Sequence, residues 1–96
     1  MIQHPTRIYV ISLLAQYPQL SPLEMSRKMR HGLPLVAYHV RICRDLGAIR
    51  EVETRHRRGA VEHFYEIIPE SRLAIREAIV EAREIRDAVE HAFANL

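Results

Sequence analysis

The sequence predicts a mostly α-helical (α+β) fold, a winged helix-turn-helix with a two-stranded β-hairpin wing and a long C-terminal dimerisation helix. One observation is a short helical run, LPLVAYHVRICRDLG, that passes directly into two strand-like runs joined by Arg57-Arg58-Gly59. Another is a heptad pattern of apolar residues that continues to the end of the chain. We therefore expect a winged-helix domain over residues 1–68 and a dimerisation helix over residues 69–96.

Length and composition indicate one small domain. A chain of 96 residues buries only roughly 60–65% of the surface that it exposes when unfolded, which leaves no room for a second catalytic domain. No run approaches the roughly 18 consecutive apolar residues of a membrane span, and the N-terminus lacks a signal-peptide cleavage site. The single cysteine, Cys43, cannot form an internal disulfide. We expect a cytoplasmic protein that makes no membrane contact.

Local signals mark the first two helices. Residues 5–17 should form the first helix, with Pro5 in its first turn. They carry a one-sided apolar stripe at spacings of three and four, formed by Ile8, Ile11, Leu14 and Ala15. The segment Ser21-Pro22-Leu23-Glu24 is a capping box, in which the Ser21 hydroxyl accepts from the Glu24 amide and Glu24 reaches back. Pro22 suits a first helical turn, so a second helix should run from Pro22 to about Arg30.

The third helix should follow after a link of only three or four residues. His31-Gly32 breaks the second helix, Pro34 sits at the first turn of the next, and Gly47 ends it. Such a tight link is the helix-turn-helix arrangement. One face is expected to be buried and to include an inert Cys43 thiol, with Val36 and Val40 beside it. The outward or flanking residues are Leu35, Ala37, Tyr38, Arg41 and Arg44.

The second half of the chain predicts a hairpin and a long helix. Ile49 to His56 and Val61 to Ile67 are rich in β-branched and aromatic residues. Pro69 opens the final segment, whose apolar residues recur at alternating spacings of three and four. This seam should either pair two chains in a homodimer, the interpretation that we favour, or fold back on its own domain. Its residues are Ile75, Ala78, Ala82, Ile85, Val89, Ala92 and Leu96.

Charge is unevenly distributed, although the formal net charge is only +2. Residues 21–58 carry nine basic and four acidic residues, whereas residues 59–96 carry four basic and eight acidic residues. A basic segment within a helix-turn-helix indicates double-stranded DNA as the partner. Arginine can pair with guanine and apolar groups can touch the thymine methyl, a mixture that the third helix supplies through Leu35, Ala37, Tyr38 and Arg41. Phosphate or minor-groove contacts are expected from Arg27, Lys28, Arg55, Arg57 and Arg58.

Four motifs resemble the winged-helix transcription regulators of the ArsR type: HPTR, SPLEMSRKM, YHVRICRDLGAI and RRGAVEHFYEI. The resemblance covers essentially the whole chain and implies a regulator, with repression as the expected sign. It implies that Tyr38 and Arg41 take base- and backbone-facing positions on the recognition helix, that His39 matches the family's histidine there, and that Arg57 and Arg58 approach the minor groove or phosphates. Arg44, on the same helix, is also expected to contact DNA. The chain departs from the metal-sensing members, because LEMSRKM has no thiol and His91 is the only histidine of the last helix.

Other functions have less support. The six histidines are scattered singly, so we expect no metal site and no cofactor. His39 could be a core histidine bonded to backbone, a phosphate contact or a pH-sensitive group. There is no phosphate loop, nucleophile motif or carboxylate pair with a matching base, so we expect no enzyme. The competing hypothesis is a winged-helix module that binds a protein instead of DNA. No residue indicates a small-molecule effector.

Overall fold

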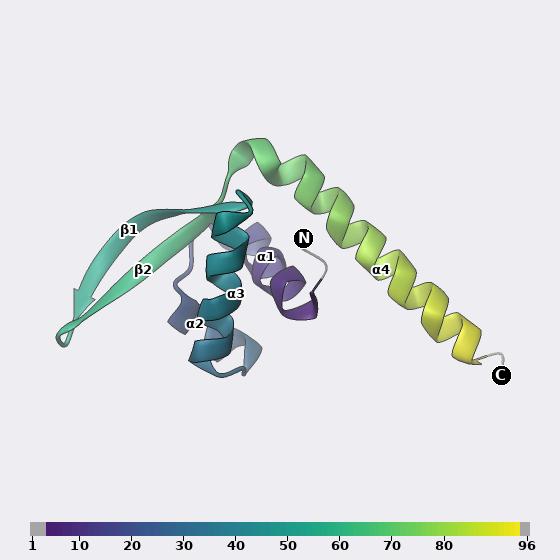
Figure 1. The fold of residues 1–96 in the computed structure, drawn as a ribbon, viewed down its shortest axis with the longest axis horizontal. Helices are drawn as coiled ribbons and strands as arrows, with labels where there is room; N and C mark the ends of the chain where they lie inside the picture. The colour runs from purple at the N-terminus through teal and green to yellow at the C-terminus, as the bar shows by residue number, and fades with distance from the viewer. Residues whose placement is uncertain (1–3, 95–96) are drawn as a thin grey trace.

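The computed structural model describes residues 4–94 and has the predicted winged-helix architecture (Figure 1). Three helices form the body: α1 (Pro5–Gln16), α2 (Pro22–Met29) and α3 (Leu33–Asp45). The hairpin consists of β1 (Ile49–Arg57) and β2 (Ala60–Ile67). A single 3-10 turn, Pro69–Ser71, leads into α4 (Arg72–Ala94). The hairpin and α4 leave the body in opposite directions, which gives the molecule a long axis of 55 Å.

The predicted helix signals act as expected. Ser21 Oγ accepts from the Glu24 amide at 3.1 Å and Glu24 Oε1 accepts from the Ser21 amide at 3.0 Å, so the capping box is complete. Arg30 ends α2 in the left-handed region, with φ 56°, and only His31 and Gly32 separate it from α3. Gly47 follows α3 with φ 79°, a conformation that glycine adopts without strain.

The two strands are each one residue longer than predicted at the tip, so that only Arg58 and Gly59 remain in the turn. Both have positive φ, 50° and 82°, as a type I′ hairpin turn requires. A register shift between Glu51 and Glu53 bends the hairpin close to the body. At the base of the hairpin, an isolated bridge between Leu20 and Tyr65 ties β2 to the segment before α2.

The core lies where α1, α2 and α3 meet the base of the hairpin. The predicted buried face of α3 is confirmed, because Val36, Val40 and Cys43 are all fully buried. They pack in one cluster with residues of every other helix and of both strands: Val10, Ile11, Leu13, Leu14, Leu20, Met25, Met29, Ala48, Ile49, Tyr65, Ile67 and Ile75. Only the first residue of β1 is buried, so the rest of that strand projects from the body.

The stripe predicted for α1 is partly wrong. Ile11 and Leu14 are buried as expected, but Ile8 is only half-buried and Ala15 is exposed. The core is instead completed by Val10 and Leu13. The reason is that α1 packs closely against α3 but only loosely against α4, so residues on its α4 side stay open to solvent. Ile8 and Ala15 lie on the side of α1 that faces α4.

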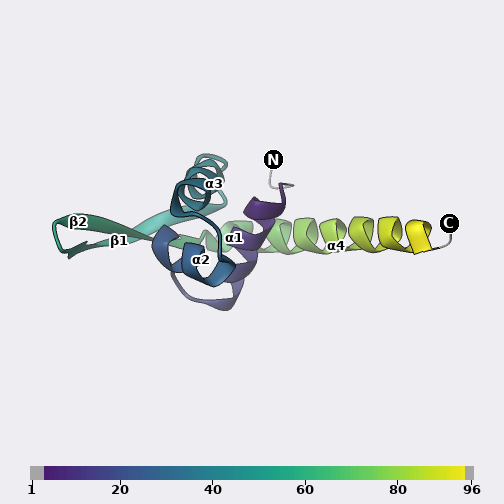
Figure 2. The ribbon, with the colours of Figure 1, turned by 90° about the horizontal axis from the view of Figure 1, so that it is seen from below.

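The last helix joins the body only through its first turns. Ile75 is buried in the core and Ile79 packs against it. Beyond these residues α4 extends away from the three-helix body as a straight arm (Figures 1 and 2). None of the helices between residues 4 and 94 has both the length and the apolar character that crossing a membrane requires.

Candidate nucleic-acid interface

The outward face of α3 is one row of exposed residues. Pro34, Tyr38, Arg41 and Asp45 recur at spacings of four and three, opposite the buried face of the helix, and all four are exposed. Tyr38 leaves 51% of its surface open to solvent. Leu35 flanks this row on one side, and the half-buried Ala37 flanks it on the other side, toward the hairpin. The predicted outward position of these residues is confirmed.

A groove of about 530 Å³ separates α3 from the hairpin. Arginines enter it from both walls: Arg41 and Arg44 from α3, and Arg57 from β1. Apolar residues of both walls line it as well, namely Leu33, Ala37 and Val61. The fold thus brings arginines that are more than a dozen positions apart in sequence to the two walls of the same groove.

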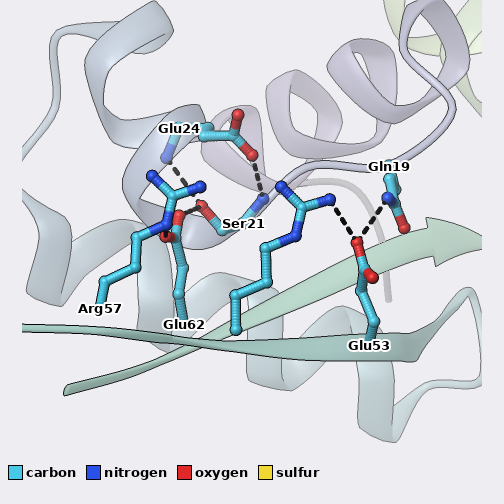
Figure 3. Close-up of polar contacts among 7 residues, drawn as sticks. Gln19, Ser21, Glu24, Glu53, Arg57 and Glu62 are labelled. Atoms are coloured by element: carbon cyan, nitrogen blue, oxygen red, sulfur yellow. Dashed lines mark hydrogen bonds and ion pairs between the residues drawn. The ribbon is translucent and has the colours of Figure 1, made fainter. Parts of the chain in front are cut away.

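A carboxylate network at the floor of this groove joins the hairpin to α2 (Figure 3). Glu62 accepts from the Ser21 hydroxyl with one oxygen, and its other oxygen lies 3.2 Å from Arg57 Nε. Ser21 is fully buried and also caps α2. Since a hydrogen bond to a charged group is stronger than a neutral one, this network fixes the angle between the hairpin and the helix-turn-helix.

A second carboxylate repeats the pattern on β1. Glu53 Oε1 accepts from Gln19 Nε2 at 2.7 Å and from an Arg55 guanidinium nitrogen at 2.6 Å. The guanidinium carbon of Arg55 lies 4.4 Å from the centre of the Phe64 ring, which is buried. Arg55 and Arg57 are therefore each held by a carboxylate that also bonds the segment before α2, whereas Arg50, at the base of β1, pairs with Glu66.

The predicted cationic residues fall into two groups. Arg44 pairs with Asp45 at 3.1 Å, and Lys28 lies 4.2 Å above the Tyr17 ring. Together with Arg55 and Arg57, these residues form the engaged group, whose charged ends each contact a carboxylate or an aromatic ring of the same chain. In contrast, Arg27, Arg41 and Arg58 form no ion pair with any residue between 4 and 94. Arg58 sits at the tip in the left-handed region, which for a residue with a Cβ costs about 1 kcal/mol.

His39 lies inside the body and not on the exposed face of α3. It is 4% exposed, its Nδ1 accepts from Arg7 Nε at 3.2 Å, and its ring stacks on His4 at 4.3 Å. Burial, together with the nearby His4 and Arg7, lowers its pKa below the ordinary value of 6.5. Of the alternatives for His39, the structure supports the core histidine over the phosphate contact, since the chain covers this side chain. Its partner is also the Arg7 side chain, not backbone.

The remaining chemistry-bearing residues offer no reactive site. Burial raises the pKa of the Cys43 thiol to about 11, so the thiol stays protonated and unreactive at neutral pH. Among residues 4–94, histidine, cysteine and carboxylate side chains form no group of three or more that could hold a metal ion.

The apolar seam of α4 divides into a covered part and an open part. Ile75 is only 4% exposed and belongs to the core, so we remove it from the expected dimer contact. Ala78 and Ala82 are half-buried, whereas Ile85 and Val89 are about half exposed. Ala92 is exposed as well, and Leu96 lies outside the described residues. The open part of the seam thus begins after Ala82.

Sequence reasoning missed several residues of these two surfaces. Phe93 is 70% exposed and continues the face of Val89 four residues further on, but a strict heptad assigned Ala92 and Leu96 instead. Leu33 and Val61 were not assigned to the α3–hairpin groove. Glu53 and Glu62 were counted only as charges, and no signal along the chain indicates that they bond Gln19 and Ser21.

Comparisons with known proteins support the fold. No family model and no curated protein matches the sequence. Among solved structures, an ArsR family transcriptional regulator is 25% identical, with 88% of this chain and 80% of that chain covered and a TM-score of 0.56. The YusO protein from Bacillus subtilis is 18% identical, with 93% and 61% covered and a TM-score of 0.69. Streptococcus pneumoniae FabT in complex with DNA is 20% identical, with 93% and 59% covered and a TM-score of 0.59.

These matches confirm the winged-helix fold with a long C-terminal helix. The match to the ArsR family regulator also confirms the resemblance to winged-helix transcriptional regulators of the ArsR type. This chain spans only about three fifths of the length of YusO and FabT.

Proposed function

We propose that this protein is a transcriptional regulator that binds double-stranded DNA as a homodimer and represses by occupying a promoter. The N-terminal half of α3 would enter the major groove, and the tip of the hairpin would contact the neighbouring backbone. Its place of action would be the compartment that holds the DNA, the cytoplasm if the cell has no nucleus. The match to FabT, which was solved with DNA bound, agrees with this role.

The observation that carries the proposal is the placement of the unpaired arginines. Arg41 on α3 and Arg58 at the hairpin tip have no carboxylate partner among residues 4–94, and both are exposed. A phosphate or a guanine edge would supply the missing partner. Arg58 also occupies a backbone conformation that asparagine or glycine would adopt more easily, so a function offers the best reason for an arginine there.

The homodimer is supported by the open part of the α4 seam. Ile85, Val89 and Phe93 are exposed on an arm that residues 4–94 leave largely uncovered. A cavity of about 700 Å³ between α1 and α4, lined by Ile8, Ala78, Ala82 and Ile85 among others, continues this apolar surface. The corresponding arm of a second copy would fill both and would set the distance between two recognition helices.

The test is a titration of the purified protein against a random-sequence duplex and against a pool selected from random sequences, at two salt concentrations. Tighter binding to the selected pool, with affinity that falls steeply as salt rises, would support the proposal. Equal affinity for both pools would leave only nonspecific DNA binding.

The alternative is a module that binds a protein through the same face, which the exposed Leu33, Leu35 and Tyr38 could serve. Absence of binding to either pool at low salt would reject the DNA proposal and favour this alternative. The unpaired Arg41 and Arg58 favour DNA, because a protein partner offers no general reason for free guanidinium groups on both elements.

A further inference from the structure

The surface that α3 would present to DNA carries almost no charge along its first half. From Leu33 to Val40 there is no charged side chain, apart from a buried His39 whose lowered pKa keeps it neutral at pH 7. Leu33, Leu35 and Tyr38 are all exposed on this half of the helix. The single free guanidinium of α3 is that of Arg41, because Arg44 is paired with Asp45.

Asp45 defines which part of α3 can enter a groove. It lies in the same outward row as Tyr38 and Arg41, and it is exposed. Because Asp45 pairs with Arg44, this end of α3 carries no net charge that would attract the phosphates, so the C-terminal end of α3 should stay outside the groove. The residues that meet base edges are then Leu35, Tyr38 and Arg41.

Apolar side chains can recognise only one base in the major groove. Thymine alone presents a methyl group there, whereas a G·C pair presents two acceptors and a donor. A leucine placed against a G·C edge would leave those polar groups without partners and would lose binding energy. Arg41 is suited to the opposite task, since a guanidinium pairs with the two acceptors of guanine.

We propose that this protein recognises its site chiefly through thymine methyl groups, contacted by Leu35 and Tyr38, next to one guanine contacted by Arg41. The inference rests on the proposed DNA-binding function and defines the class of duplex that α3 selects. Along the helix Leu35, Tyr38 and Arg41 are three residues apart, a rise of about 4.5 Å per step. The rise of B-DNA is about 3.4 Å per base pair. The contacted thymines and the guanine therefore lie within about three or four neighbouring base pairs.

The experiment uses a duplex selected by the protein from a randomised pool, and versions of it in which deoxyuridine replaces thymine. Uracil pairs as thymine does but lacks the methyl group. Replacement at a contacted thymine should weaken binding roughly four-fold for each methyl lost. Replacement outside the half-sites serves as the control and should leave the affinity unchanged.

A variant assigns the contact to its residue. In Leu35→Ala, deoxyuridine at one of the sensitive thymines should no longer weaken binding, because the partner of that methyl is already gone. Leu46→Ala, at an exposed leucine just beyond α3, is the matched control and should keep the full sensitivity. Circular dichroism confirms that both variants fold.

Two results would overturn the inference. One is equal affinity for the thymine and deoxyuridine duplexes, and the other is a selected site with G·C pairs opposite Leu35 and Tyr38. Either would leave the proposed function intact, because the protein would still bind a selected sequence. Absence of sequence-selective binding would remove the proposed function, and the inference would fall with it.

Discussion

The two ends of this molecule both expose apolar side chains, but they differ in the charges that surround them. Leu35 and Tyr38 share α3 with the unpaired guanidinium of Arg41, and the hairpin tip at this end of the molecule adds that of Arg58. By contrast, α4, which carries Ile85 and Val89, has five carboxylates and four arginines interspersed along its length. A surface with free charges of one sign suits a polyanion, whereas a seam bordered by both signs suits a second copy of the same helix.

Under the proposed function, the end with α3 and the hairpin would recognise DNA, and the α4 end would join two chains. The two roles meet in the spacing of the recognition helices, which a dimer through α4 would hold at a fixed distance. Each role can be removed separately, because only the first turns of α4 belong to the core that supports α3.

Ile85→Glu combined with Val89→Glu should dissociate the dimer and lower affinity for a duplex with two half-sites roughly 100-fold or more. The physical reason is that two linked half-site contacts become two independent ones. Both side chains are about half exposed in the single chain, so its fold should persist. Sedimentation and DNA titration measure the two effects. Leu73→Glu, an exposed residue of α4 outside the seam, is the control; a wild-type protein that is already monomeric would contradict the prediction.

Arg41→Ala should weaken binding to the selected site by about 1–3 kcal/mol, roughly 5- to 150-fold, and should relax the preference for guanine at one position. Binding to random DNA should change little in comparison. Titration with the selected duplex and with a version altered at that guanine measures both effects. Arg27→Ala, at an exposed and equally unpaired arginine of α2, should instead weaken both duplexes by similar factors; the same pattern for Arg41 would show that it contacts only phosphate.

Arg57 and Arg58 are adjacent in sequence but differ in their contacts. Arg57 pairs with Glu62, whereas Arg58 has no ion pair with any residue between 4 and 94. Replacing both by alanine should flatten the slope of log affinity against log salt concentration by roughly one to two units. Arg58→Ala alone should account for most of this change, because Arg57 is already paired with Glu62. Arg58→Asn should also raise the free energy of unfolding, by up to about 1 kcal/mol, since asparagine tolerates the left-handed turn better. Titrations at several salt concentrations, with urea unfolding beside them, measure both; an unchanged slope would mean that the wing touches no phosphate.

His39 should make stability, rather than recognition, depend on pH. Its pKa is lowered in the folded chain, so between 6.5 and that lower value the unfolded chain binds more protons and the free energy of unfolding falls as the pH falls. His39→Gln keeps an acceptor for Arg7 but cannot titrate, and it should flatten this dependence. Urea unfolding at pH 7.5 and pH 5.5 tests this. His56→Gln, on the exposed hairpin, is the control; an equal pH dependence in wild type and His39→Gln would refute the assignment.

Features set by neighbouring residues could be predicted from the sequence. The capping box at Ser21, the glycine stop at Gly47 and the buried face around Val40 depend on spacings within one helix, and the structure confirms them. The outward positions of Tyr38 and Arg41 follow from the same periodicity. Local rules therefore sufficed for the order of the elements and for the exposed face of α3.

Features set by distant contacts could not be predicted. The burial of His39 depends on Arg7 of α1 and on His4, the residue that caps this helix, and the position of Ile75 in the core depends on how α4 begins. The partners of Glu62 and Glu53 come from the segment before α2, which nothing in the hairpin sequence indicates. These contacts form only after the elements have packed, so the engaged and free arginines could be separated only in the folded chain.

The most direct test of the account is sedimentation of the complex with the selected duplex, with the number of chains per duplex as the readout. We predict two chains on each duplex and a site of two inverted half-sites centred roughly 34 Å apart along the helix axis. A single chain on each saturated duplex, with a site that has no inverted repeat, would contradict the division of the molecule into a recognition end and an assembly end.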